Sequence, residues 1–217
     1  MKKILGCILI IFFAGTVSSQ IIYLETGKVL ATFDYKNSDG ERLGDLSGSN
    51  ENNIALGARL AILSSPVHVS LGGEYFKLAA SSSDPTLGNY LEWDASFAGA
   101  NLGVDFEFFK PSANRNVDVG FSFYVKGAIA ADFMVSGTRK LNSQATDLTG
   151  VEEFDKPLYF IRGGIGGNYY ISRSFVAYAQ YMFGRSSLFG NYTDQEQLRF
   201  LTHTISIGLG INLFYNR

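Results

Sequence analysis

Long stretches in which apolar residues alternate with small or polar ones limit what this chain can fold into. The run from 201 to 215 has Leu201, Ile205, Ile207, Leu209, Ile211, Leu213 and Tyr215 at odd positions, and Thr202, Thr204, Ser206, Gly208, Gly210 and Asn212 at even ones. A second run, 117 to 135, has Val117, Val119, Phe121, Phe123, Val125, Ile129, Ala131, Phe133 and Val135 on one face, and Asp118, Ser122, Tyr124, Lys126 and Asp132 on the other. A period of two predicts strands with two different faces. Because strands of soluble proteins are usually 3 to 10 residues long, these strands are expected to cross a bilayer at a tilt.

The same alternation predicts eight strands whose connections sort by length. The strands are expected at about 28 to 36, 52 to 63, 67 to 78, 90 to 109, 116 to 136, 157 to 171, 175 to 185 and 198 to 215. Four long polar connections, 37 to 51, 79 to 89, 137 to 156 and 186 to 197, alternate with three short ones, 64 to 66, 110 to 115 and 172 to 174. Outer-membrane barrels have short periplasmic turns and long external loops. The sequence therefore predicts an all-β fold, an eight-stranded antiparallel up-and-down transmembrane β-barrel with both termini in the periplasm.

The composition is consistent with a single barrel domain. The chain of 217 residues is 46% hydrophobic and 18% charged, too apolar for disorder, and its 24 glycines are too many for a helical bundle. A formal charge of −2, without a basic cluster, gives no reason to expect a nucleic-acid partner.

Residues 1 to 19 are expected to be a secretory signal peptide and residues 20 to 217 the barrel. Lys2 and Lys3 precede an apolar segment at 4 to 14, and Val17 to Ser19 fits a cleavage site. About 14 apolar residues are too few for a spanning helix. Cys7 stands at the start of the apolar segment rather than after it, which argues against a lipidated cysteine.

The alternation also predicts which side chains face the lumen and which face lipid. Charged residues expected inside are Asp34, Arg59, Glu74, Asp94, Asp105, Lys126, Asp132 and Arg162. Residues expected to face lipid are Leu56, Leu60, Val69, Leu71, Phe97, Phe106, Phe121, Ile161, Ala179 and Ile207. Apolar residues change from odd to even positions across 98 to 100, so a β-bulge is expected near Gly99. Aromatic girdles at the two interfaces are expected from Tyr35, Trp93, Phe108, Phe109, Tyr169, Phe175, Phe183 and Tyr215.

The C-terminus carries the most specific local resemblance. Gly210 to Tyr215 has a glycine followed by hydrophobic residues at +3 and +5, as in barrel-insertion signals, although Gly208 stands where a polar residue is usual and Asn216 and Arg217 follow the aromatic. Together with the strand pattern, this resembles the small eight-stranded outer-membrane barrels of the OmpX and OmpA membrane-domain type. The resemblance implies an outer-membrane location and insertion by the barrel-assembly machinery. It implies no single activity, because such barrels include anchors, adhesins and enzymes.

No catalytic, cofactor-binding or metal site is expected. His68, Ser70 and Glu74 share a face and resemble the His-x-Ser pairing of lipid A deacylases. They follow the turn at 64 to 66, however, which places them at the periplasmic rim and inside the lumen, far from lipid A. His203 and Ser206 lie on opposite faces of their strand and cannot form a dyad.

The remaining motifs are weaker still. The segment from 35 to 46 lacks the first and last carboxylates of a calcium loop. The glycines at 163 to 167 have no helix after them, so close packing around lumen side chains explains them better than a phosphate cradle. No Cys/His cluster has metal-ligand spacing.

The sequence favours a structural anchor or surface-interaction protein over a passive pore, with a lipid-modifying enzyme as a distant third. Side chains can fill an eight-stranded barrel, and a paired network containing Glu74, Lys126 and Arg162 is expected to plug this one. Lipid and lipopolysaccharide of the outer membrane are the expected surroundings, and a surface partner is left open.

Overall fold

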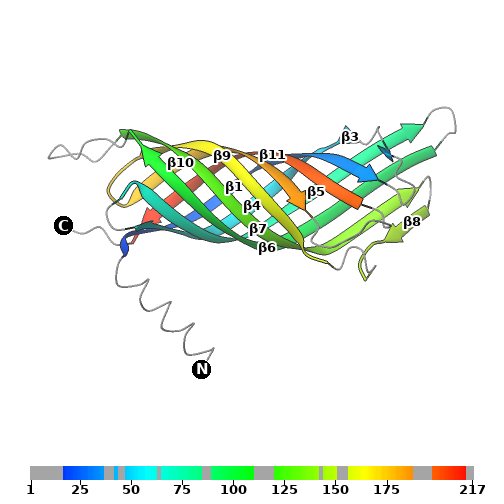
Figure 1. Cartoon of the computed structure of the whole chain (residues 1–217), viewed down its shortest axis with the longest axis horizontal. Coiled ribbons are helices and arrows are strands. Elements are labelled where there is room, and N and C mark those ends of the chain that lie inside the picture. The colour runs from blue at the N-terminus through cyan, green and yellow to red at the C-terminus, as the bar shows by residue number, and fades with distance from the viewer. Residues whose placement is uncertain are drawn as a thin grey trace, which may run out of the picture.

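The computed structural model shows a closed antiparallel barrel (Figure 1). It describes residues 17–36, 42–43, 47–62, 65–84, 89–109, 120–141, 144–150, 156–187 and 197–213. Eight long strands form the wall: β1 (Val17–Lys36), β4 (Asn50–Ile62), β5 (Val67–Asp84), β6 (Asn89–Phe108), β7 (Gly120–Leu141), β9 (Leu158–Tyr170), β10 (Phe175–Ser187) and β11 (Gln197–Asn212). Three short strands, β2 (Arg42–Leu43), β3 (Ser47–Gly48) and β8 (Gln144–Asp147), pair with β1, β5 and β7 respectively. No helix of the described ranges is long and apolar enough to cross a membrane.

Neighbouring strands pair in chain order, and β11 pairs with β1 to close the barrel. A row of register partners that leaves β1 at Ile22 runs through Ala58, Leu71, Leu102, Ile129, Ile161, Arg185 and Leu201, and returns to β1 at Thr32. The stagger around the barrel is therefore ten residues, from Ile22 to Thr32. With a rise of about 3.3 Å per residue and a strand spacing of about 4.8 Å, this stagger tilts the strands by about 41°. The eight-stranded antiparallel fold predicted from the sequence is confirmed.

The two ends of the barrel differ. At one end, which we call the turn end, β1 and β5 begin and β11 ends. Residues 171 to 174 join β9 to β10 at this end, and Ile171 N donates a backbone hydrogen bond to Phe175 O (3.0 Å). The opposite end is the loop end, where β3 and β8 lie (Figure 1). Both termini of the wall lie at the turn end, since Ile21 is paired with Asn212.

An apolar belt covers the outside of the barrel. Residues such as Leu71, Phe121, Ile161 and Ile207 have 60–69% of their surface exposed, which water would not favour. On β11 the belt runs from Leu213 to His203, and at about 2.5 Å of axial rise per residue this is about 25 Å, the height of a lipid-facing band. Of the ten residues expected to face lipid, nine are on the outer face and the exception is Phe97.

The lumen divides into an apolar half and a polar half. At the loop end a cluster of buried side chains fills the barrel; we call it the apolar plug. Its members are Val29, Ala31, Phe33, Phe76, Leu78, Ala80, Trp93, Ala95, Phe97, Ala130, Leu148, Leu158, Phe160 and Phe200, with Met134 packed against it. Toward the turn end the inward side chains are charged or polar.

The plug corrects the expectation for β6. Trp93 and Phe97 were expected to face lipid but lie inside, with ring centroids 6.4 Å apart and 7% and 2% exposure. Asp94, expected in the lumen, faces outward between Ala79 and Thr138. Odd residues of β6 point inward from Trp93 to Glu107, so there is no bulge at Gly99. The register shift in this region lies opposite Ser96 and Phe97, where β7 carries one extra residue.

The strands at the loop end are longer than expected. β5 and β6 extend to Asp84 and Asn89, so the expected loop at 79 to 89 is mostly hairpin. β8 lies within the expected loop at 137 to 156, and β2 and β3 lie within the one at 37 to 51. β1 begins at Val17 rather than near 28, and β7 begins at Gly120 rather than 116. The strand positions of Asp34 and Tyr35 are described but their side chains are not, and Tyr215 lies outside the described residues.

Candidate functional site: the filled lumen

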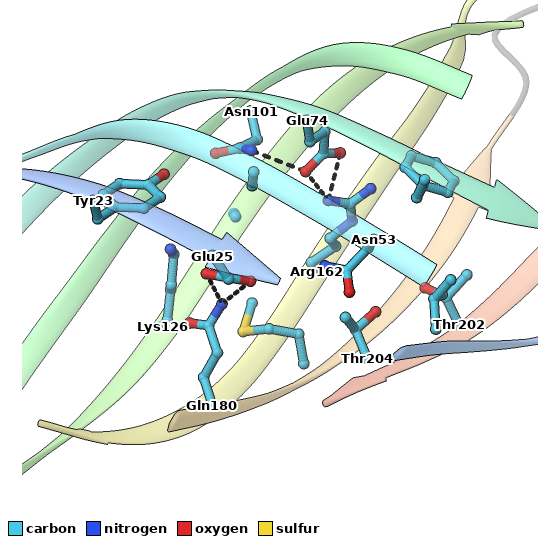
Figure 2. A pocket seen from close by; sticks show the side chains of 15 residues that line it. Tyr23, Glu25, Asn53, Glu74, Asn101, Lys126, Arg162, Gln180, Thr202 and Thr204 are labelled. Carbon is cyan, nitrogen blue, oxygen red and sulfur yellow. Dashed lines mark hydrogen bonds and ion pairs between the residues drawn. The ribbon is translucent and has the colours of Figure 1, made fainter. Parts of the chain in front are cut away.

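An ion-paired cluster crosses the middle of the lumen. The guanidinium of Arg162, from β9, contacts both carboxylate oxygens of Glu74, from β5, at 2.6 Å and Asp132 Oδ2, from β7, at 3.2 Å. Asn101 Nδ2 donates to Glu74 Oε2 at 2.9 Å (Figure 2). The Arg162 guanidinium also lies 4.9 Å from the ring centroid of Phe160. Arg162 therefore joins the polar half of the lumen to the apolar plug.

A second group surrounds Glu25 of β1. Gln180 Nε2 donates to both Glu25 oxygens, at 2.9 and 2.8 Å, and the Tyr178 hydroxyl donates to Oε2 at 3.0 Å. Tyr124 donates to Gln180 Oε1 at 3.1 Å. Three strands, β1, β7 and β10, therefore meet through one buried carboxylate and the side chains bonded to it, although the sequence prediction placed Glu25 before the first strand.

A third group closes the turn end. Arg59 forms an ion pair with Asp105, and Glu107 accepts hydrogen bonds from Ser122, from Asn168 at 3.0 Å and from Tyr170 at 2.6 Å. His68 lies beside these acids, with Nδ1 3.7 Å from Asp105 and Nε2 3.6 Å from Glu107. His68 is therefore part of this polar group, beside its two carboxylates.

The candidate dyad is not assembled. His68 and Ser70 are both buried and face the lumen as expected, but the described contacts include no hydrogen bond between them. His203 is on the outer face and Ser206 on the inner face, as expected. Within the described residues there is also no group of three or more His, Cys, Asp or Glu side chains that could hold a metal.

Lys126 differs from its expected role. The predicted pairing of Glu74 with Arg162 is present, but no carboxylate of the described residues lies within ion-pair distance of Lys126 Nζ. The ammonium instead lies 5.9 Å from the ring centroid of Tyr23 and points between Tyr23 and Glu25 (Figure 2). It lines two internal cavities of about 60 and 30 Å³. Cavities of this size hold roughly four and two waters respectively, which can solvate the ammonium.

Among the glycines at 163 to 167, Gly166 serves the packing that the sequence suggested, whereas a Cβ on Gly163 would meet nothing within 4 Å. A Cβ on Gly166 would lie 2.2 Å from the Tyr124 ring, and one on Gly208 would lie 2.2 Å from the Tyr178 ring. Both glycines therefore leave room for a tyrosine that fills the lumen.

The apolar plug interrupts any channel along the axis. Phe160, Phe200, Leu78 and Ala95 come from four different strands, and each has at most 1% of its surface accessible. A water-wide passage beside them would expose these side chains. The plug that the sequence predicted from polar side chains is thus built of two parts, a polar network and a larger apolar cluster.

No family model matches this sequence, and no curated protein matches it. Solved structures do match. Neisserial surface protein A is 10% identical over 88% of this chain and 96% of its own, with a TM-score of 0.49. OprG from Pseudomonas aeruginosa is 13% identical over 92% and 98%, with a TM-score of 0.49, and the N-terminal barrel of P. aeruginosa OprF is 14% identical over 91% and 99%, with a TM-score of 0.45.

The chain is similar to small eight-stranded outer-membrane barrels. At these identities the likeness concerns the fold alone. The barrel itself follows from the strand pairing and the exposed apolar belt, and the plug follows from the buried side chains of this chain.

Proposed function

We propose that this chain is an outer-membrane anchor that presents its loop end to the exterior and does not conduct solutes. The observation that carries the proposal is the apolar plug, which fills the loop-end half of the lumen with aromatic and aliphatic side chains. A barrel with no open lumen can act through its outer surface and its ends. The apolar belt, about 25 Å high, supports a membrane location.

The loop end is the part of the wall that extends beyond this belt. Outward residues of β6 there are polar, although Phe133 and Val135 of β7 are apolar and more than half exposed, and the exposed pair Lys140 and Glu92 is joined at 3.1 Å across β6 and β7. The long β5–β6 hairpin and β8 add a rim around the plug. A surface partner would meet this rim first.

Planar-bilayer conductance tests the anchor against the pore. The folded protein is expected to give no steady channels, because the plug leaves no water-wide passage. A matched variant, Phe97→Ala, enlarges the interior without changing charge, and it serves as a control that opening the plug is detectable. Steady channels from the unmodified protein, of the size that the variant gives, would favour the pore.

Location is tested separately in the native host. Fractionation is expected to place the protein in the outer membrane, with a gel mobility that changes on boiling. Protease added to intact cells is expected to cut within 37 to 51, 79 to 89, 137 to 156 or 186 to 197, and not at Arg115 or Arg173. Cleavage at Arg173 in sealed cells would invert the orientation.

A further inference from the structure

Three nitrogen-bearing side chains form a diagonal line on the outer face of three adjacent strands. Arg185 lies on β10, His203 on β11 and Lys28 on β1, and all three are exposed. Register pairs Phe183 with His203 and His203 with Leu30, so each basic residue is a diagonal neighbour of the histidine. Diagonal neighbours lie about 7–8 Å apart, which is within the combined reach of arginine and lysine side chains. We call this group the basic row.

The tilt of the strands places the basic row at one height on the barrel. The stagger is ten residues over eight strands. A line at constant height along the barrel axis therefore moves about 1.25 residues toward the turn end, relative to the register row, for each strand crossed from β10 toward β1. Arg185 shares a register row with Leu201 and Thr32. A level line from Arg185 therefore passes near 202 on β11 and between 29 and 30 on β1, so His203 and Lys28 lie within about two residues of it.

On β5, β10 and β11 this height is the loop-end edge of the apolar belt, whereas on β7 the exposed Phe133 and Val135 continue beyond it. Below the row on β11, Ile205, Ile207 and Leu209 are each more than 60% exposed, while above it a partly exposed Leu201 is followed by the exposed Arg199. On the other side of the barrel the outward residues change from Tyr75 to Lys77 on β5 at the corresponding level. The basic row thus lies where acyl chains end and lipid headgroups begin.

The contact between Tyr181 and His203 leaves Nε2 of the imidazole as a hydrogen-bond donor. The Tyr181 hydroxyl lies 2.6 Å from His203 Nδ1, and the phenol is the natural donor because an imidazole nitrogen is the better proton acceptor. The ring proton then resides on Nε2, which is free of this contact. Phe183 packs edge-to-face against the imidazole at 5.3 Å and fixes its plane.

The charge around the basic row is positive. The outward carboxylates described on the wall strands, Glu92 and Asp94, lie on β6, which is directly across the barrel from β11. An anion at the basic row would therefore meet the arginine fork, an imidazole N–H and an ammonium, and no carboxylate among the described side chains lies beside it.

We propose that the basic row binds the phosphate of a phosphorylated lipid headgroup in the outer leaflet, an inference that rests on the membrane location proposed above. The occupant is a lipid rather than free phosphate, because the row adjoins the apolar belt that its acyl chains would cover. The guanidinium of Arg185 takes two phosphate oxygens, His203 Nε2–H a third, and Lys28 supplies a second charge for the same headgroup.

The test measures retention of bisphosphorylated lipid A by the folded, detergent-solubilised full barrel, using native mass spectrometry. The variants are Arg185→Gln, Lys28→Gln and their combination, and the matched control is Arg139→Gln, an exposed arginine on β7. Each variant in the row is expected to weaken binding about tenfold and the pair more, since a charge-assisted hydrogen bond is lost each time. The control and the unmodified protein are expected to bind alike.

Comparison of different lipids identifies which chemical group of the lipid the basic row recognises. Dephosphorylated lipid A is expected to bind no better to the unmodified protein than to the double variant, and inorganic phosphate is expected not to displace the bound lipid. Equal retention of both lipids, or no loss in the double variant, would overturn the proposal. Heat modifiability is recorded for every sample: an unmodified protein that fails to shift on boiling would refute the membrane barrel itself, whereas a normal shift with unchanged lipid binding refutes only the basic row.

Discussion

Removing Arg162 is expected to destabilise the barrel by about 3 kcal/mol. The change Arg162→Ala leaves Glu74 and Asp132 buried without their cation, and breaking a buried pair typically costs 3–5 kcal/mol. The lower end applies here because the Arg162 side chain keeps 17% exposure and borders a cavity of about 60 Å³, from which water can reach the carboxylates. The ratio of folded to unfolded protein would fall about 150-fold.

Urea unfolding in lipid vesicles measures this loss. Trp93 is the only tryptophan and lies in the apolar plug, 5.1 Å from Phe33, so its fluorescence reports whether the interior is packed. Arg139→Ala removes an exposed arginine and is expected to leave the midpoint nearly unchanged.

A triple change separates a stranded charge from simple loss of packing. Replacing the whole cluster, as Glu74→Gln, Asp132→Asn and Arg162→Met, removes every charge while keeping volume, and it is expected to recover most of the stability. A midpoint for Arg162→Ala equal to that of the Arg139 control would refute the reasoning. A triple variant no more stable than Arg162→Ala would show that the penalty was not a stranded carboxylate.

Three further predictions test facing, packing and the loop end. Ile207→Arg on the belt should cost roughly 2–4 kcal/mol in the same unfolding assay, while Thr204→Ser on the cavity wall should change the midpoint little; equal tolerance would reverse inside and outside. Gly208→Ala should lower stability by displacing the Tyr178 ring, and Tyr178→Phe combined with it should not rescue folding, because the ring itself occupies the space. At the loop end, the Thr149 amide donates to Asp147 Oδ1 at 2.9 Å and holds the pKa of that carboxyl below its usual range. Since a depressed folded pKa stabilises the turn above the unfolded pKa, protection of the Thr149 amide from hydrogen exchange should be lost as pH falls through the folded pKa, and pH-independent protection would contradict this.

Whether a side chain faces the lumen or the lipid could be predicted wherever the outer face of a strand lies entirely in lipid and its inner face entirely in a polar lumen. On β11 and on the turn-end half of β7, lipid selects Ile207 and Phe121 while the crowded lumen selects Ser206 and Ser122, so a simple alternation identifies both faces. The lumen charges Arg59, Asp105, Lys126 and Arg162 were predicted on the same basis. Their pairing was only partly predictable, because alternation gives a face but not a height on the tilted wall.

Glu25 and its donors were missed for a different reason. Ile21 to Leu24 is apolar on both faces, so this part of β1 has no alternation and was predicted to precede the first strand. Glu25 is inward, and its partners Tyr178 and Gln180 lie on alternate positions of β10, the parity that faces the lumen. Buried Tyr178 and Gln180 side chains need a hydrogen-bond acceptor. That need, met by Glu25 on β1, two strands from β10, is the sequence signal that was available.

The error on β6 identifies where the wall leaves the membrane. On β5 the inward residues change from Glu74 to Phe76 while the outward ones change from Tyr75 to Lys77, and the inward and outward positions keep their parity throughout. β6 inverts its polarity in the same way at Ala98, which is the register partner of Tyr75. A polarity inversion without a bulge means that the surroundings changed, not the backbone: lipid outside a polar lumen gives way to water outside an apolar plug. On these two adjacent strands, which invert at one register pair, this change therefore locates the edge of the lipid-facing belt. The basic row lies within about two residues of the same height on the other side of the barrel, which is what its proposed contact with lipid headgroups requires.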